Sequence, residues 1–240
     1  MVTPFYLLLI HFAISGMTAS VPGSNVGPKP VLYYVYDPLC GWCYGFSPVI
    51  TKIHENWKDK IDIEVISGGM ILEDRVGPVS EVAPYIKTAY KIVEEGTGVK
   101  FGEAYLADLL GEGKTIMNSW YLCVAMTVFK SFDKKNQVAF ASALQKAVYF
   151  DGMAPEDTDA IAKLAATFGL DAKAFKDSMN SEEMKYATKQ EFQFAEDLSA
   201  TGFPTLIVKV GEEYFLMARG YVSYEVLEER LEKAMQPASK

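Results

Sequence analysis

The sequence predicts an α/β fold in which a β-α-β unit near the start and a β-β-α unit at the end are separated by a large all-helical insertion. Three observations support this prediction. A strand-like run at residues 31–36 is followed by a helix-like segment and a second strand-like run. Residues 73–199 show helical periodicity and no convincing strand pattern. The last part of the chain contains two strand-like runs and an amphipathic helix.

The first unit begins with Val31–Tyr36, a run of β-branched and aromatic residues. Because the run is continuous rather than alternating, it predicts a central strand buried on both faces. Asp37 and Pro38 end this strand, and a helix is expected from about Cys40 to Lys58. Ile61–Ile66 is the second predicted strand, so the segment forms a βαβ unit.

The last unit contains a predicted hairpin and a helix. Thr205–Val210 and Tyr214–Ala218 are strand-like and are separated by the short turn Gly211–Glu213. Tyr224–Met235 has the periodicity of an amphipathic helix. The chain therefore ends in the order strand, strand, helix.

The first thirty residues are expected to be an address segment and a linker. Residues 1–20 carry no charged side chain and resemble a signal peptide, with a candidate cleavage site at Thr18-Ala19-Ser20. The apolar run is shorter than a membrane span, and Val21–Pro30 is rich in proline and glycine. We expect a periplasmic or secreted protein with no stable membrane span in the mature chain. A cytoplasmic protein with an uncleaved extension is the alternative.

Composition narrows the possible chemistry. The chain of 240 residues has 31 acidic and 23 basic side chains, a formal net charge of -8. Nucleic-acid binding needs a basic stripe, so we expect no nucleic-acid partner. Three cysteines are too few for a disulfide scaffold, and two of them lie three residues apart. These counts indicate redox or metal chemistry at one position.

Cys40-Gly41-Trp42-Cys43 lies where the first strand passes into the helix, a position typical of redox-active dithiols. Unpaired backbone N–H groups and the positive end of the helix dipole favour a thiolate there. Cys40 is therefore expected to be the exposed nucleophile, and Cys43 the more buried thiol that resolves a mixed disulfide. Asp37 and Glu64 are candidate proton acceptors for Cys43.

Other interpretations of the cysteines are weaker. Half of a zinc site would need a second ligand pair, but the chain has only two histidines, His11 and His54, so no metal site is expected. A structural disulfide between Cys40 and Cys43 is disfavoured by the strand-to-helix position. Cys123 lies in an apolar helical segment, where a free cysteine acts as a small hydrophobic residue rather than a regulatory thiol.

A second motif lies far along the chain. Thr201-Gly202-Phe203-Pro204-Thr205 directly precedes a predicted strand. Together with Asp37-Pro38-Leu39-Cys40-Gly41-Trp42-Cys43 and the helical insertion, it resembles the DsbA-like thioredoxin superfamily, and most closely the FrnE-like thiol-disulfide oxidoreductases. The resemblance covers about residues 31–236.

The resemblance implies a thioredoxin fold with an inserted helical domain. Residues 31–72 and 200–240 would form the thioredoxin-like domain, residues 73–199 the insertion, and residues 1–30 the signal peptide and linker. It also implies a cis peptide bond between Phe203 and Pro204.

The resemblance also implies the site and its partners. The redox-active residues would be Cys40 and Cys43, and the backbone before the cis-proline, at Phe203-Pro204, would pair with an extended substrate strand. Trp42 is a candidate for contacting apolar substrate, and the alternative is that it only covers the site. The partners would be protein thiols or disulfides and a redox-recycling protein. No cofactor is needed beyond the cysteine pair, although glutathione could serve as a co-substrate.

The first functional hypothesis is therefore a thiol-disulfide oxidoreductase or isomerase similar to protein disulfide isomerases. Two alternatives stay open. One is a glutathione-dependent transferase or isomerase similar to the kappa class, whose members usually have serine where Cys40 stands. The other is a non-catalytic peptide-binding chaperone.

Overall fold

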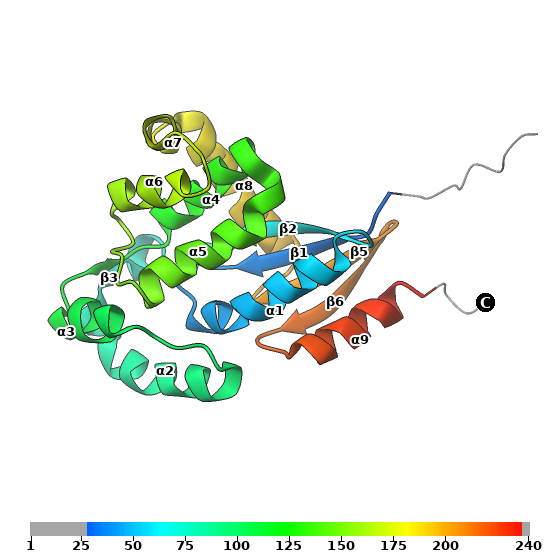
Figure 1. Ribbon diagram of the computed structural model, residues 1–240, viewed down its shortest axis with the longest axis horizontal. Helices are drawn as coiled ribbons and strands as arrows, with labels where there is room; N and C mark the ends of the chain where they lie inside the picture. Colours follow the sequence, from blue (N-terminus) through cyan, green and yellow to red (C-terminus); the bar gives the residue numbers. More distant parts are fainter. Residues whose placement is uncertain (1–27, 237–240) are drawn as a thin grey trace, which may run out of the picture.

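The computed structural model describes residues 28–236, except the side chains of Asp108 and Leu109. The predicted signal peptide and most of the predicted linker lie outside the described residues. The chain folds into a four-stranded sheet with the strand order β2-β1-β5-β6 and a set of inserted helices beyond one end of it (Figure 1).

The sheet and its two helices come from the two ends of the described chain. Their bounds are β1 Val31–Tyr36, α1 Gly41–Trp57, β2 Asp62–Ser67, β5 Thr205–Val210, β6 Glu213–Arg219 and α9 Tyr224–Ala234. β1 pairs in parallel with β2 and antiparallel with β5, and β5 pairs antiparallel with β6. The predicted β-α-β and β-β-α units are thus confirmed, and together they form a thioredoxin-like fold.

β1 lies between two layers of helices, as its continuous apolar sequence predicts. Leu32, Tyr34 and Tyr36 belong to the main core, which also contains residues of α1 and α9. Val35 faces the opposite side and packs with Ala195 of α8. β1, which precedes Cys40 in the chain, is therefore packed against other elements on both of its faces.

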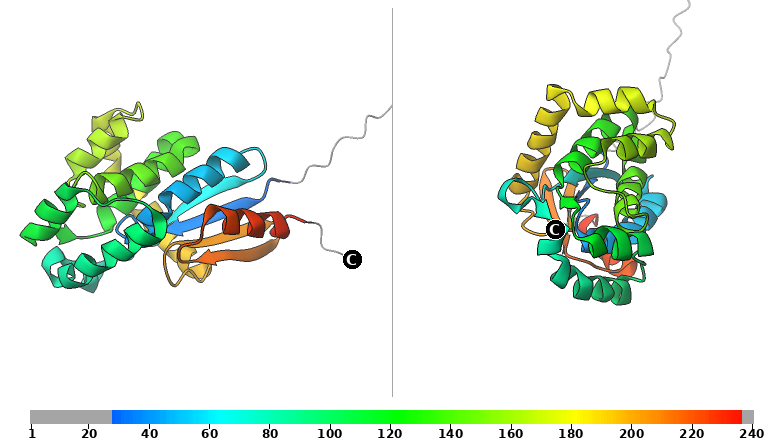
Figure 2. Two further views of the ribbon diagram at one scale, coloured as in Figure 1. Left: turned by 60° about the horizontal axis from the view of Figure 1, so that its bottom comes forward. Right: turned by 90° about the vertical axis from the view of Figure 1, so that its left-hand side faces the viewer.

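The inserted segment contains most of the helices of the described chain. They are α2 Ala83–Thr97, α3 Leu110–Glu112, α4 Trp120–Asp133, α5 Gln137–Tyr149, α6 Thr158–Ala166, α7 Ala172–Met179 and α8 Glu182–Asp197, with a π-helix at Ala104–Leu109 and short 3-10 turns at Glu73–Arg75, Val79–Glu81 and Lys134–Asn136. Figures 1 and 2 show that α2 and α3 form an arm apart from α6 and α7.

The prediction of an all-helical insertion is wrong in one detail. Gly77–Pro78 (β3) and Ile116–Met117 (β4) pair antiparallel in a separate two-stranded ladder. Two-residue strands are too short to leave a periodic pattern in a sequence, which explains why they were not expected. The ladder joins the two ends of the segment that contains α2, the π-helix and α3.

Side chains of the insertion complete the outer edge of β2. The Gln137 side chain accepts a hydrogen bond from the Val65 backbone N–H at 2.9 Å and donates one to the Ile63 carbonyl at 2.8 Å. Lys130 donates to the Val65 carbonyl at 2.7 Å, and Glu191 accepts from the Ser67 N–H at 3.1 Å. An exposed strand edge is a template for unwanted pairing, and these side chains cover it.

Candidate active site

Cys40 caps the amino terminus of α1. Its φ and ψ angles of -91° and 112° are extended, while its carbonyl already accepts the N–H of Tyr44 at 3.0 Å. The turn before it is fixed by Asp37, whose carbonyl accepts the N–H of Cys40 at 3.1 Å and whose carboxylate accepts the N–H of Leu39 at 2.8 Å. The turn that begins at Asp37-Pro38 thus positions Cys40 at the start of α1.

The two cysteines differ in acidity. The pKa of Cys40 is lowered, first by hydrogen bonding from the Cys43 thiol and then by the backbone N–H groups of Cys43 and Trp42, against the opposing effects of burial and Asp37. The pKa of Cys43 is raised well above its ordinary value by burial and by its interaction with Cys40. This difference suits Cys40 as the attacking thiolate and Cys43 as the thiol that stays protonated until later.

The expectation that Cys40 is exposed is wrong in degree. The structure has both cysteines as free thiols, with Cys40 7% exposed and Cys43 fully buried. Cys40 contacts the loop that precedes β5 on one hand and lines a cavity on the side of the insertion on the other. The expected order of burial holds, but the nucleophile is reached through a recess.

The two distant motifs meet at this sulfur. The peptide bond between Phe203 and Pro204 is cis, as the resemblance implies. The Cys40 thiol donates to the carbonyl of Phe203 at 3.5 Å, across 163 residues of sequence. Trp42 is partly buried and lies 6.3 Å, between ring centroids, from Tyr221 after β6. The predicted site residues Cys40 and Phe203 are therefore brought together, and Trp42 lines the same cavity as Cys40.

Asp37 is the buried charge of the site. Besides Leu39, its carboxylate accepts hydrogen bonds from the Met70 N–H at 2.7 Å and the Ser119 hydroxyl at 2.8 Å. Burial raises its pKa, and these three bonds oppose the rise. Its charge contributes to the raised pKa of Cys43, and its role as the proton acceptor stays a prediction. Glu64, the other candidate, is ion-paired with Lys130 and Lys134.

Cys123 is fully buried in α4, as expected for a core residue. Its sulfur lies 4.0 Å from the Asp37 carboxylate, and burial first, then the Asp37 charge, raises its pKa well above the ordinary value. A thiol in that environment is a poor nucleophile. Among residues 28–236, no group of three or more histidine, cysteine, aspartate or glutamate side chains could hold a metal ion.

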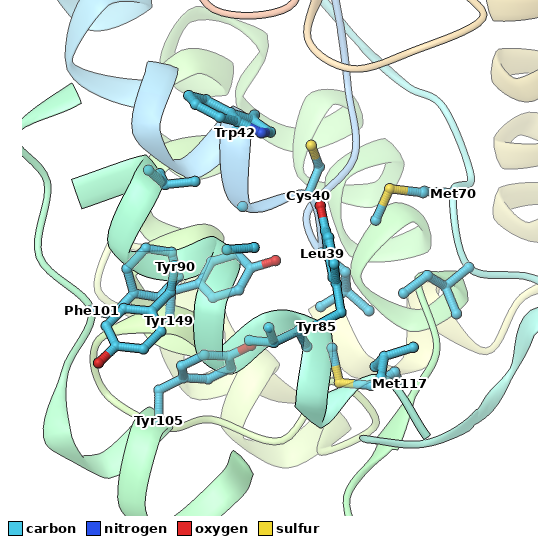
Figure 3. Close-up of a pocket in the computed structure, with 16 residues that line it drawn as sticks. Leu39, Cys40, Trp42, Met70, Tyr85, Tyr90, Phe101, Tyr105, Met117 and Tyr149 are labelled. Carbon is cyan, nitrogen blue, oxygen red and sulfur yellow. The ribbon is translucent and has the colours of Figure 1, made fainter. Parts of the chain in front are cut away.

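The sequence did not reveal a cavity of about 280 Å³ beside Cys40. Figure 3 shows its residues, which come from the Cys40 turn and the start of α1, the loop after β2, α2 with its flanking residues, the π-helix, β4 and the end of α5. They are Leu39, Cys40, Gly41, Trp42, Met70, Ile71, Val82, Tyr85, Ile86, Ala89, Tyr90, Val93, Phe101, Tyr105, Met117 and Tyr149. These positions are scattered along the sequence, so no local sequence pattern predicts the cavity.

A thioredoxin-like fold with a C-x-x-C pair at the start of α1 and a cis-proline loop against it defines a protein of the thiol-disulfide oxidoreductase class. Comparison with family models agrees, because residues 31–232 match the DSBA-like thioredoxin domain. The chain belongs to this family. Curated proteins, in contrast, give no match to the sequence.

Solved structures show similar proteins. A candidate protein disulfide isomerase from Nitrosomonas europaea is 26% identical with a TM-score of 0.77, covering 88% of this chain and all (100%) of that one. The cytosolic disulfide reductase DsbM from Pseudomonas aeruginosa is 24% identical with a TM-score of 0.73, covering 85% and 98%. A 2-hydroxychromene-2-carboxylate isomerase, 17% identical with a TM-score of 0.56, shares the fold. The FrnE-like refinement stays a prediction.

No helix within residues 28–236 has the length and apolar character needed to cross a membrane.

Proposed function

We propose that this protein exchanges disulfides with protein thiols through Cys40 and Cys43. The observation that carries the proposal is the position of the Cys40 sulfur, which lies at the start of α1 and 3.5 Å from the carbonyl before the cis-proline. The described relatives that are 24–26% identical include a disulfide reductase and a candidate disulfide isomerase, which supports the same chemistry.

The reaction balances as two exchanges. The Cys40 thiolate attacks one sulfur of a substrate disulfide, a bond forms between these two sulfurs, and the second substrate sulfur leaves as a thiolate that takes up a proton. Cys43 then loses its proton and attacks Cys40, which forms the Cys40–Cys43 disulfide and releases the first substrate sulfur. The substrate is reduced by two electrons and the protein is oxidised. Oxidation of a substrate dithiol runs the same steps backwards.

The direction of the reaction follows from the compartment. In an oxidising compartment the pair would oxidise or isomerise substrates, whereas in the cytosol it would be kept reduced and would reduce them. The predicted export segment and the cytosolic DsbM relative point in opposite directions.

Three single variants test the proposal in an assay of insulin reduction by dithiothreitol. Cys40→Ser should abolish catalysis, because it removes the attacking sulfur. Cys43→Ser, mixed with a substrate disulfide in the absence of dithiothreitol, should accumulate a mixed disulfide that mass spectrometry detects, because the resolving thiol is missing. Cys123→Ala is the matched control and should keep most of the activity. Full activity of Cys40→Ser would refute the proposal.

A further inference from the structure

The cavity beside Cys40 offers an occupant a predominantly apolar environment. Among the 16 lining residues there is no aspartate, glutamate, lysine, arginine or histidine. One wall is a set of packed rings, in which Phe101 lies 5.7 Å from Tyr90 and 5.2 Å from Tyr149, measured between centroids. The opposite wall contains Met70 and Met117, whose flexible thioethers adapt to different shapes (Figure 3).

The size of the cavity suits one side chain. An apolar cavity of about 150 Å³ can hold benzene, so the volume of about 280 Å³ here has room for a phenylalanine, leucine or methionine side chain. A charged group would gain no ionic partner from the described lining and would lose its hydration. Glutathione, with two carboxylates and an ammonium group, therefore fits this lining poorly.

The mouth of the cavity leaves apolar surface uncovered. Tyr85 on α2 is 71% exposed, and Val82, directly before α2, is 43% exposed. Both residues line the cavity, so their exposed surface continues into it. Exposed apolar side chains at the entrance of a cavity give an incoming apolar group a surface to contact.

The cavity and the cis-proline loop both adjoin Cys40. Cys40 lines the cavity and also donates to the Phe203 carbonyl. A substrate cysteine bonded to Cys40 would thus lie near both the loop and the cavity. Neighbouring residues of an extended chain lie about 3.3–3.6 Å apart along it, so a side chain one or two positions from that cysteine is close enough to enter.

From this geometry we propose that the cavity is a specificity pocket for an apolar side chain next to the reacting cysteine of a protein substrate. The proposal rests on the proposed function, since the substrate is held by a disulfide to Cys40. The pocket selects aromatic or large aliphatic neighbours over polar and charged ones.

Short peptides carrying one cysteine test this selectivity. Each cysteine is linked by a disulfide to 5-thio-2-nitrobenzoate, and attack by Cys40 on the peptide sulfur releases the coloured thiol. The peptides differ only in the residue before or after the cysteine, which is phenylalanine, leucine, serine or glutamate. In at least one of these two positions, the second-order rate constant of the reduced protein with the phenylalanine peptide should exceed that with the serine peptide at least about tenfold. Equal values at both positions would overturn the proposal.

Variants on α2 locate the effect. Ala89→Trp fills the pocket and should reduce the preference for phenylalanine to about twofold or less. Ile92→Trp adds the same ring on the same helix, at a residue that is 54% exposed and outside the lining, and should keep the preference. An unchanged preference in Ala89→Trp would contradict the proposal.

A second pair of variants, at exposed positions, tests the pocket even if Ala89→Trp does not fold. Tyr85→Ala trims the mouth at an exposed residue and should lower the preference at least about threefold, whereas Tyr186→Ala removes a tyrosine that is 65% exposed on α8 and should not. If Tyr85→Ala kept the wild-type preference as Tyr186→Ala does, the pocket would not be the site of selection.

A disulfide of N-acetylcysteinamide with the same reporter distinguishes failure of the pocket proposal from failure of the proposed function. If the wild-type protein reacts with it but shows no preference, only the pocket proposal fails; if it reacts with no disulfide, the proposed function fails.

Discussion

The negative charge of Asp37 acts on both thiols of the site. Asp37 is fully buried and is fixed by the Leu39 and Met70 N–H groups and the Ser119 hydroxyl. Burial raises the pKa of both Cys40 and Cys43, and the charge of Asp37 raises both further, more weakly than burial does. Asp37 therefore opposes the hydrogen bond from the Cys43 thiol and the backbone N–H groups at the start of α1, which lower the pKa of Cys40. It limits how acidic the nucleophile becomes.

Asp37→Asn should lower the pKa of Cys40 further, because it removes that opposing charge. Only the thiolate reacts with iodoacetamide, so the rate rises with pH through the pKa of Cys40, and the whole profile should move to lower pH in the variant. The free energy of unfolding should fall by about 1–3 kcal/mol, since the new NH₂ group would face the Met70 N–H donor.

Glu64→Gln is the control for this prediction. Glu64 is ion-paired with Lys130 and Lys134, so its neutralisation should leave the alkylation profile in place. An alkylation profile of Asp37→Asn that stays at the wild-type pH or moves upward would show that the charge does not control Cys40.

At the scale of the elements, the sheet strands and the helices α1 and α9 could be predicted because each has a strong local pattern. The cysteine motif and Phe203-Pro204 could be predicted for the same reason. The β3–β4 ladder could not, since each strand has two residues. The pocket could not either, because its walls come from separate segments, which only the tertiary fold brings together.

The end of β2 and the cis-proline loop pack so closely that only glycine fits at position 68. A Cβ on Gly68 would lie 2.1 Å from the Phe203 ring, whereas a Cβ on Gly202, in the loop itself, would meet nothing within 4 Å. The ring of Phe203 therefore has its place because Gly68 has no side chain. The contact connects the loop before β5 to the strand β2.

Gly68→Ala should destabilise the protein by about 1–3 kcal/mol, the usual cost of overpacking, because the Phe203 ring must move. Denaturant unfolding measures this change. Gly202→Ala is the matched control and should change the free energy of unfolding by less than about 0.5 kcal/mol. If the two variants were equally stable, the close approach of Gly68 to Phe203 would not contribute to the fold.

At the scale of the whole molecule, the insertion and the thioredoxin-like part depend on each other. The insertion supplies Gln137, Lys130 and Glu191 to the free edge of β2, as well as most of the pocket next to Cys40. The sheet in return gives α8 a surface on which Ala195 packs. We therefore expect the described chain to unfold as one cooperative unit rather than as two domains.

Gln137→Ala tests this coupling. Gln137 is only 4% exposed, and its loss leaves the Val65 N–H and the Ile63 carbonyl without these partners, at about 1–3 kcal/mol for each group that water does not reach. Cys43 reports on the thioredoxin-like part and Cys123 on the insertion, because both are fully buried.

In the reduced protein, alkylation of Cys43 and Cys123 at increasing urea concentration should show both thiols losing protection together, at a lower midpoint in Gln137→Ala than in the wild type. Gln193→Ala is the control, because Gln193 is exposed and bonds only to Glu196 and Asp197 of its own helix, and its midpoint should stay near the wild-type value. Loss of Cys43 protection while Cys123 stays protected would instead mean that the insertion folds independently and that the covered edge of β2 does not join the two parts.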